Sequence, residues 1–96
     1  MYDYAISAVR YDSTETHIQA VRVHRDFGTS IGHAMVCDRA FVADLISRNK
    51  ATFQTVVKGT TNPWQDGARI HVIDDVYLST DPNSRKKDNL GNLPTF

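Results

Sequence analysis

The sequence predicts an α+β fold in which one helix packs on a mostly antiparallel sheet of about five strands. Most apolar residues fall in short runs with the two-residue period of strands, and one run, at about 38–49, has the spacing of a helix. Turn-forming residues separate these runs. The pattern also fits a sheet curled toward a half-barrel. With 96 residues, the chain is expected to form a single domain, 1–96, with one modest core.

An N-terminal hairpin is expected first. Alternating aromatic and β-branched residues predict a strand at 2–11, with Tyr4, Ile6 and Ala8 on one face. A second strand is predicted at 17–24, after a turn of four or five residues.

The helix follows a glycine-containing connector, 25–32, and a short extended piece, 33–36. Asp38 is the predicted N-cap, and Asn49 can take the left-handed position that closes a helix. An apolar stripe at i, i+1, i+4 and i+5 predicts the face that packs on the sheet. The stripe consists of Phe41, Val42, Leu45 and Ile46.

Three more strands are predicted in the second half of the chain. They are separated by the polar loop 59–67 and by a tight turn at Asp74–Asp75, and they span 52–58, 68–73 and 76–80. Because a small open sheet must protect its edges, the C-terminal segment is predicted to form an ordered clasp over one edge or one barrel end. The clasp would pack through Leu90, Leu93 and Phe96.

The last third carries two patterned segments, tyrosine-leucine-x-threonine at 77–80 and Asp-Asn-Leu-x-x-Leu-Pro at 88–94. They resemble the ending of a family of small bacterial and phage domains without an assigned function, domain-of-unknown-function family thirty-eight ninety-two. The resemblance extends over most of the chain and implies the same fold, but it supplies no activity. The chain departs from the family pattern in the loop 60–66 and at Ser79, where a basic residue is common.

Composition excludes several classes of function. Eleven basic side chains balance eleven acidic ones, so no global charge draws the chain to nucleic acid or to an anionic membrane. The single cysteine, Cys37, excludes an intrachain disulfide and suits a reducing compartment. The first residues show neither a signal peptide nor a membrane span. We therefore expect a cytoplasmic protein with no membrane partner.

No coherent catalytic or metal-binding constellation emerges. Cys37 with His33 would form a thiol site if the helix N-terminus lowered the pKa of the thiol; the alternative is that Cys37 packs as an apolar residue before the helix. His24, His33, Cys37 and Asp38 lack the paired spacing of metal ligands. We expect no metal, no cofactor and no enzymatic activity.

Binding residues are more readily proposed. Trp64, in a polar loop, either folds back on the core or is displayed as an interaction anchor. The triplet 85–87 is the best basic patch. The predicted partner-binding residues are Trp64, Gln65, Arg69, Tyr77, Arg85, Lys86 and Lys87.

The leading hypothesis is a small non-enzymatic module that acts through protein–protein contact, as a phage or mobile-element modulator or inhibitor of a host or defence complex. The alternative is a protein that binds nucleic acid or a nucleotide ligand through the basic turn 85–87 and aromatic residues of the sheet. Binding of that kind would weaken steeply with salt. Homodimerisation through a sheet edge is left open.

Overall fold

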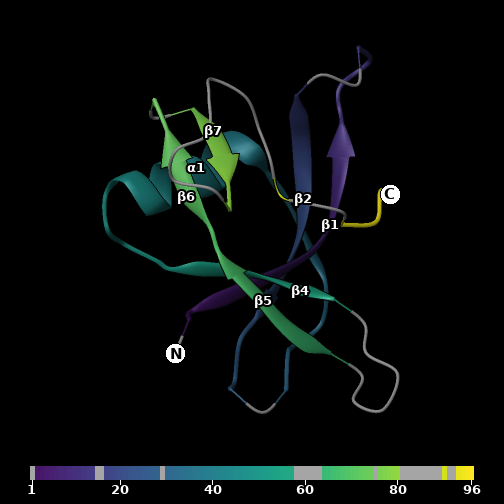
Figure 1. Cartoon of the computed structure of the whole chain (residues 1–96), viewed down its shortest axis with the longest axis vertical. Coiled ribbons are helices and arrows are strands. Elements are labelled where there is room, and N and C mark those ends of the chain that lie inside the picture. The colour runs from purple at the N-terminus through teal and green to yellow at the C-terminus, as the bar shows by residue number, and fades with distance from the viewer. Residues whose placement is uncertain are drawn as a thin grey trace.

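A computed structural model describes residues 2–14, 17–28, 30–57, 64–74, 76–80, 90 and 93–96. The described residues form the predicted α+β fold: one helix, a five-stranded mostly antiparallel sheet that does not close into a barrel, and a separate two-stranded hairpin (Figure 1). The elements are β1 (Tyr4–Tyr11), β2 (Ile18–Arg25), β3 (Met35–Asp38), α1 (Arg39–Ser47), β4 (Phe53–Val57), β5 (Gln65–Arg69), β6 (His71–Ile73) and β7 (Tyr77–Ser79).

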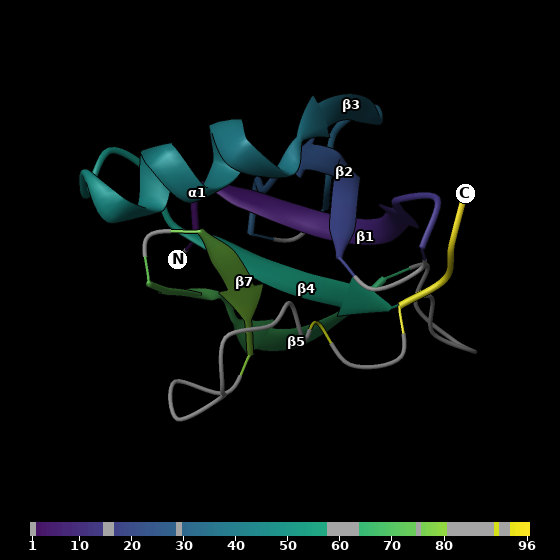
Figure 2. The same cartoon turned by 90° about the horizontal axis from the view of Figure 1, so that it is seen from above.

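β1 is the central strand of the sheet, whose order is β3-β2-β1-β4-β5. It pairs antiparallel with β2 and parallel with β4. Parallel neighbours need a crossover connection, and α1 lies in that connection and covers one face of the sheet (Figure 2). The single helix therefore both joins the two halves of the sheet and shields its core.

A bulge in β1 changes which residues face the helix. Ile6 pairs with Val23, but the next paired residue is Ala8, opposite Arg22. The extra residue shifts the alternation by one position, so Ile6 and Val9 both join the core cluster. The period-two prediction that placed Ile6 and Ala8 on one face therefore fails at the bulge.

The core lies between α1 and the sheet. Val42 and Ala43 of the helix are 1% and 2% exposed, and they pack with apolar residues from β1, β2 and β4. The rings of Tyr4 and Phe53 stack with centroids 5.2 Å apart across the parallel pair. Among the described residues, no helix is long and apolar enough to cross a membrane.

The helix ends as its sequence predicts. Asn49 has a φ of 54°, its N–H donates to the Ile46 carbonyl at 3.0 Å, and the Lys50 N–H donates to the Leu45 carbonyl at 2.9 Å. These two bonds form a Schellman motif. At the other end Asp38 occupies the N-cap position, but its side chain makes no capping hydrogen bond.

The predicted fourth strand, 68–73, is wrong in one respect, because the structure divides it in two. β5 starts earlier, inside the predicted loop, and pairs with β4, whereas β6 pairs with β7 in a separate sheet. Ile70, between them, is 1% exposed and its N–H donates to the Phe53 carbonyl at 2.9 Å. Burying this side chain in the core directs the chain out of the main sheet.

The C-terminal clasp is confirmed for Leu90 and Leu93, whereas the half-buried Phe96 ring lies 4.6 Å from the guanidinium groups of Arg10 and Arg22 instead of in the core cluster. Leu90 and Leu93 are 5% and 8% exposed and belong to the core cluster. The Val9 N–H donates to the Pro94 carbonyl at 2.9 Å, and the Phe96 N–H donates to the Val9 carbonyl at 3.0 Å. On the edge of β1 opposite β2, β4 pairs with the first half alone, so the clasp supplies hydrogen-bond partners for the second half of that edge.

Candidate functional site

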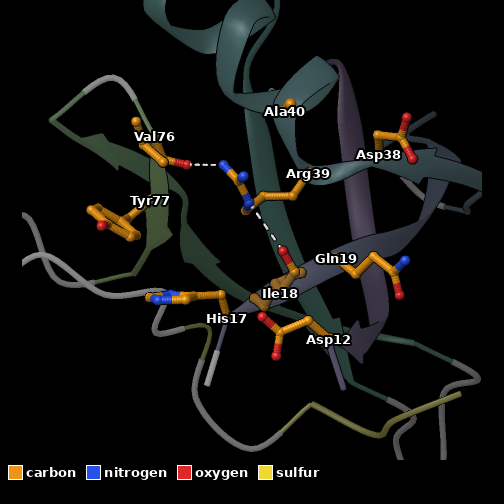
Figure 3. A pocket seen from close by; sticks show the side chains of 9 residues that line it. All are labelled: Asp12, His17, Ile18, Gln19, Asp38, Arg39, Ala40, Val76 and Tyr77. Atoms are coloured by element: carbon orange, nitrogen blue, oxygen red, sulfur yellow. Dashed lines mark hydrogen bonds between the residues drawn. The ribbon is translucent and has the colours of Figure 1, made fainter. Parts of the chain in front are cut away.

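A cleft of about 500 Å³ lies where the turn end of the β1–β2 hairpin, the start of α1 and the β6–β7 hairpin meet (Figure 3). Its volume is within the range of small-ligand sites. The cleft is lined by Asp12, His17, Ile18, Gln19, Asp38, Arg39, Ala40, Val76 and Tyr77.

Arg39 crosses this cleft and joins its walls. Its Nε donates to the Ile18 carbonyl at 3.0 Å, and one terminal nitrogen donates to the Val76 carbonyl (Figure 3). The planar guanidinium can make both bonds at once because its donors are fixed in a fork. Since these donors hold backbone carbonyls, Arg39 serves as a clamp between the helix start, β2 and the β6–β7 hairpin.

The cleft has an aromatic side and a polar side. The rings of His17 and Tyr77 meet at 5.5 Å with a tilt of 34°, while Asp38 and Gln19 lie on the opposite side (Figure 3). The Asp12 carboxylate, at one end of the cleft, accepts bonds from the Thr14 amide and hydroxyl at 3.1 and 2.8 Å. These bonds form an Asx turn, which fixes the hairpin end.

Replacing Arg39 tests the clamp. We expect Arg39→Met to lower the free energy of unfolding by about 1–2 kcal/mol, since hydrogen bonds from a charged group are worth about 1.5–3 kcal/mol and this side chain is partly exposed. Amide exchange should accelerate most in β6 and β7. Arg48→Met is the control: its side chain is 67% exposed and its nearest partner, Asp44, is 3.9 Å away. Equal losses of unfolding free energy in Arg39→Met and Arg48→Met would contradict the role of Arg39 as a clamp.

A second hollow, the β3–α1 groove, has a volume of about 260 Å³ and almost entirely apolar walls. Met35 and Cys37 are the residues of β3 that line it. Phe41, which the sequence places on the core-facing stripe, is 56% exposed at its rim. The helix is turned so that Val42 and Ala43 face inward instead. The groove is lined by Tyr4, Val23, Met35, Cys37, Phe41, Val42, Leu45 and Phe53.

An adjoining hollow of about 290 Å³ continues the groove toward the start of β3, because both share Tyr4 and Met35. It adds Arg25, Phe27 and His33, and Phe27 is 55% exposed. The apolar surface is therefore bordered by the Arg25 guanidinium and the His33 imidazole at the start of β3. The Asp38 carboxylate lies at the other end of β3.

The two edges of the sheet differ in protection. β5 has the sequence QDGAR, with all five residues exposed, and charged residues and glycine are typical of an edge that resists pairing. β3, MVCD, pairs only with β2 among the described residues, and Val36 is 59% exposed. The open edge of β3 thus runs beside the apolar β3–α1 groove.

A family described as "Protein of unknown function (DUF3892)" matches residues 5–94. The chain belongs to this family. This match confirms the family resemblance that the C-terminal segments indicate. It extends over nearly the whole chain. No curated protein matches the chain, and no solved structure does.

Four of the binding residues predicted from the sequence are described in this DUF3892 domain, and they lie at three different places. Trp64 is half-buried, its ring 5.6 Å from that of His24. Gln65 and Arg69 are exposed at the two ends of β5, and Tyr77 lies in the Arg39 cleft. The basic triplet 85–87 lies outside the described residues, so its part in binding stays a prediction.

Trp64 packs beside a buried polar pair. The Ser7 hydroxyl is 2.7 Å from His24 Nε2, and His24 Nδ1 donates to the Gly32 carbonyl at 2.9 Å. Ser7 and His24 are 4% and 5% exposed. Because the third group is a carbonyl and the hydroxyl is buried, this arrangement satisfies buried polar groups rather than presenting a nucleophile to a substrate.

The structure does not favour a reactive thiol at Cys37. Burial, together with the neighbouring Asp38 carboxylate, raises the pKa of the Cys37 thiol, whereas a reactive cysteine needs a lowered pKa. Cys37 points into the β3–α1 groove, as the packing alternative predicts. Within the described residues, no three His, Cys, Asp or Glu side chains are grouped to hold a metal ion.

The residues that sequence reasoning missed are those of the β3 edge. The sequence predicts a short extended piece that includes Met35 and Val36, and it places Phe41 on the core-facing stripe. The alternation of Met35, Val36 and Cys37 was the available signal. Only the strand order shows that this short strand lies at an edge.

Proposed function

We propose that this domain is a protein-binding module that receives an extended segment of another chain on the open edge of β3. The observation that carries the proposal is the coincidence of that unprotected edge with the apolar β3–α1 groove. In this binding mode, main-chain hydrogen bonds extend the sheet, and alternate side chains of the added strand enter a pocket.

The distribution of exposed apolar residues supports this location. Of the large hydrophobic residues described, Val36, Phe41 and Phe27 are the most exposed, at 59%, 56% and 55%. Phe41 borders the groove and Phe27 lines the adjoining hollow. Val36 lies in β3 between the groove residues Met35 and Cys37, so its side chain projects to the opposite face of the same edge strand. Clustered exposed apolar residues mark interaction sites, whereas single ones are ordinary.

The groove must supply much of the affinity. β3 has four residues, and in an edge strand only every second residue points its N–H and C=O outward. Two residues of main-chain bonding therefore fix direction and register, and an apolar side chain seated between Met35, Phe41 and Leu45 adds the buried area. An aromatic or branched aliphatic side chain suits a groove of about 260 Å³.

Charge indicates the orientation and chemistry of the segment. Arg25 and His33 lie at the start of β3 and Asp38 at its end. A segment running antiparallel to β3 has its C-terminal end near Arg25. We therefore expect an acidic residue there, because complementary charges select partner and register.

Selection of peptides from a random displayed library tests the proposal. The enriched peptides should alternate apolar residues and carry a carboxylate toward the C-terminal end. Measured by fluorescence anisotropy, Phe41→Asp should weaken binding of a synthesised peptide at least about tenfold. Val57→Asp, which alters an exposed valine of β4, should leave binding unchanged. Equal losses from both variants would contradict the proposal.

The narrower role that the sequence predicts, modulation or inhibition of a host or defence complex by a phage or mobile-element protein, stays a prediction. So does nucleic-acid binding, whose basic turn, 85–87, lies outside the described residues.

A further inference from the structure

We infer that the segment received by β3 is the β3 strand of a second copy of this chain, so that two sheets join edge to edge in a symmetric dimer. The inference rests on the proposed function, because it uses the same edge and the same groove and names their occupant.

The two edges of the sheet decide which symmetry is available. Pairing of β3 with β5 of another copy would be heterologous and would build a ring or an open filament. The exposed polar residues of β5 oppose it. Pairing of β3 with β3 places the same surface on both sides of a two-fold axis, which closes the assembly after two copies. The difference between the edges thus favours a closed dimer.

Side-chain alternation limits the register. Directly opposed residues of an antiparallel pair project to the same face of the sheet, so the axis passes beside a residue and not between two. An axis beside Val36 or Cys37, the central residues of β3, pairs more of the strand than one beside either end. With the axis beside Val36, the Val36 side chains of the two chains lie next to each other. Met35 of one chain is then opposite Cys37 of the other. Met35 and Cys37 both line the β3–α1 groove, so the two grooves meet across the axis.

Charge supports the antiparallel arrangement. Arg25 and His33 lie at the start of β3, and Asp38 lies at its end. The Arg39 guanidinium, next in sequence, is turned to the carbonyls of Ile18 and Val76. An antiparallel copy brings each Asp38 toward the end of β3 where Arg25 of β2 and His33 lie in the other chain, twice over by symmetry, and complementary charges favour that orientation.

Apolar burial favours the same partner. On one face of the joined sheet, a second copy brings its own exposed Val36 beside Val36 of the first. On the other face it brings its own groove, with Phe41 at the rim, beside the groove of the first. Each apolar group then gains an apolar neighbour and loses contact with water, the dominant favourable term in association. A self-complementary surface requires no other component.

Light scattering after size exclusion, at about 100 μM chain, tests the dimer. The wild-type chain should have twice the 10.8 kDa mass of one chain, and Val36→Lys should elute as a monomer because it adds a charge on the axis. Val36 is 59% exposed, so this variant should melt at the wild-type temperature. Val57→Lys, on β4, should remain dimeric.

Cysteine cross-linking identifies the register. Opposed residues have Cβ atoms about 4.5–5.5 Å apart, near enough for a disulfide after small adjustments. Oxidation should therefore cross-link either the wild type through Cys37, or Val36→Cys in a Cys37→Ser background. Val57→Cys in the same background is the control and should not cross-link.

The outcomes separate the inference from the proposed function. A monomeric wild type that binds selected peptides in a Phe41-dependent way overturns the dimer and supports the module. A dimer that Val36→Lys leaves intact overturns the assignment of the interface. A monomer that yields no Phe41-dependent peptide overturns both.

Discussion

Truncation from residue 90 onward is expected to abolish cooperative folding. Leu90 and Leu93 are 5% and 8% exposed within the core cluster. Losing one buried leucine side chain costs about 2–5 kcal/mol, and a whole domain is stable by about 5–15 kcal/mol. The truncation also removes both hydrogen bonds that the tail makes with Val9. Together these losses are comparable with the entire stability of the domain.

Thermal unfolding followed by circular dichroism measures this loss of stability. Single substitutions show how much of it each residue contributes. Leu93→Ala should destabilise the domain by about 2–5 kcal/mol. Thr95→Ala is the control, because Thr95 is exposed and pairs with Val9 through its backbone. A truncated chain that melts cooperatively near the wild-type temperature would show that the clasp is dispensable.

Gly67→Ala is expected to disrupt the β4–β5 pair. A Cβ atom at this position would lie 2.1 Å from Thr55 Oγ1 and 2.6 Å from the Thr55 carbonyl oxygen. Relief requires the backbone to move, because one of these atoms belongs to the main chain. The pairing is already irregular between Gln54 and Val56, so the strands approach closely at this bulge. We expect a loss of about 1–3 kcal/mol, typical of overpacking, measured by urea unfolding.

Two variants separate the steric cause from a general effect of replacing glycine. Gly32→Ala is the matched control, because its Cβ would meet no atom closer than 3.4 Å. Adding Thr55→Ala to Gly67→Ala should recover only part of the loss, since the carbonyl contact remains. Full recovery would place the whole effect on the hydroxyl, and an equal loss in Gly32→Ala would contradict the steric explanation.

Elements set by local chemistry were predictable. The β1–β2 hairpin follows from alternation, and the end of α1 follows from Asn49, whose positive φ the sequence anticipates. The division of β5 from β6 was not predictable, because residues 68–73 have strand propensity throughout. It depends on Ile70 entering a core built from distant segments. Tertiary packing overrides local preference at such positions.

The candidate site was less accessible to sequence reasoning. The apolar spacing of α1 fits a core-facing stripe through Phe41, but the rotation of a helix about its axis is decided by what it packs against. Here Val42 and Ala43 face the core and Phe41 reaches the surface. The polar residues around Trp64 in the sequence are typical of a displayed interaction anchor, yet its ring packs beside His24. An edge strand is recognised only once the strand order is known.

The clasp also determines when the domain can finish folding. The Arg10 side chain donates to the Phe96 carbonyl across 86 positions of sequence, and β1 pairs with residues from the opposite end of the chain. During synthesis the second half of β1 can pair with β2 early, but its other edge lacks a partner until the clasp segment has left the ribosome. Until then the strand exposes apolar residues and unpaired backbone groups, which favour aggregation. The nascent chain should therefore depend on chaperones most strongly just before residues 93–96 emerge.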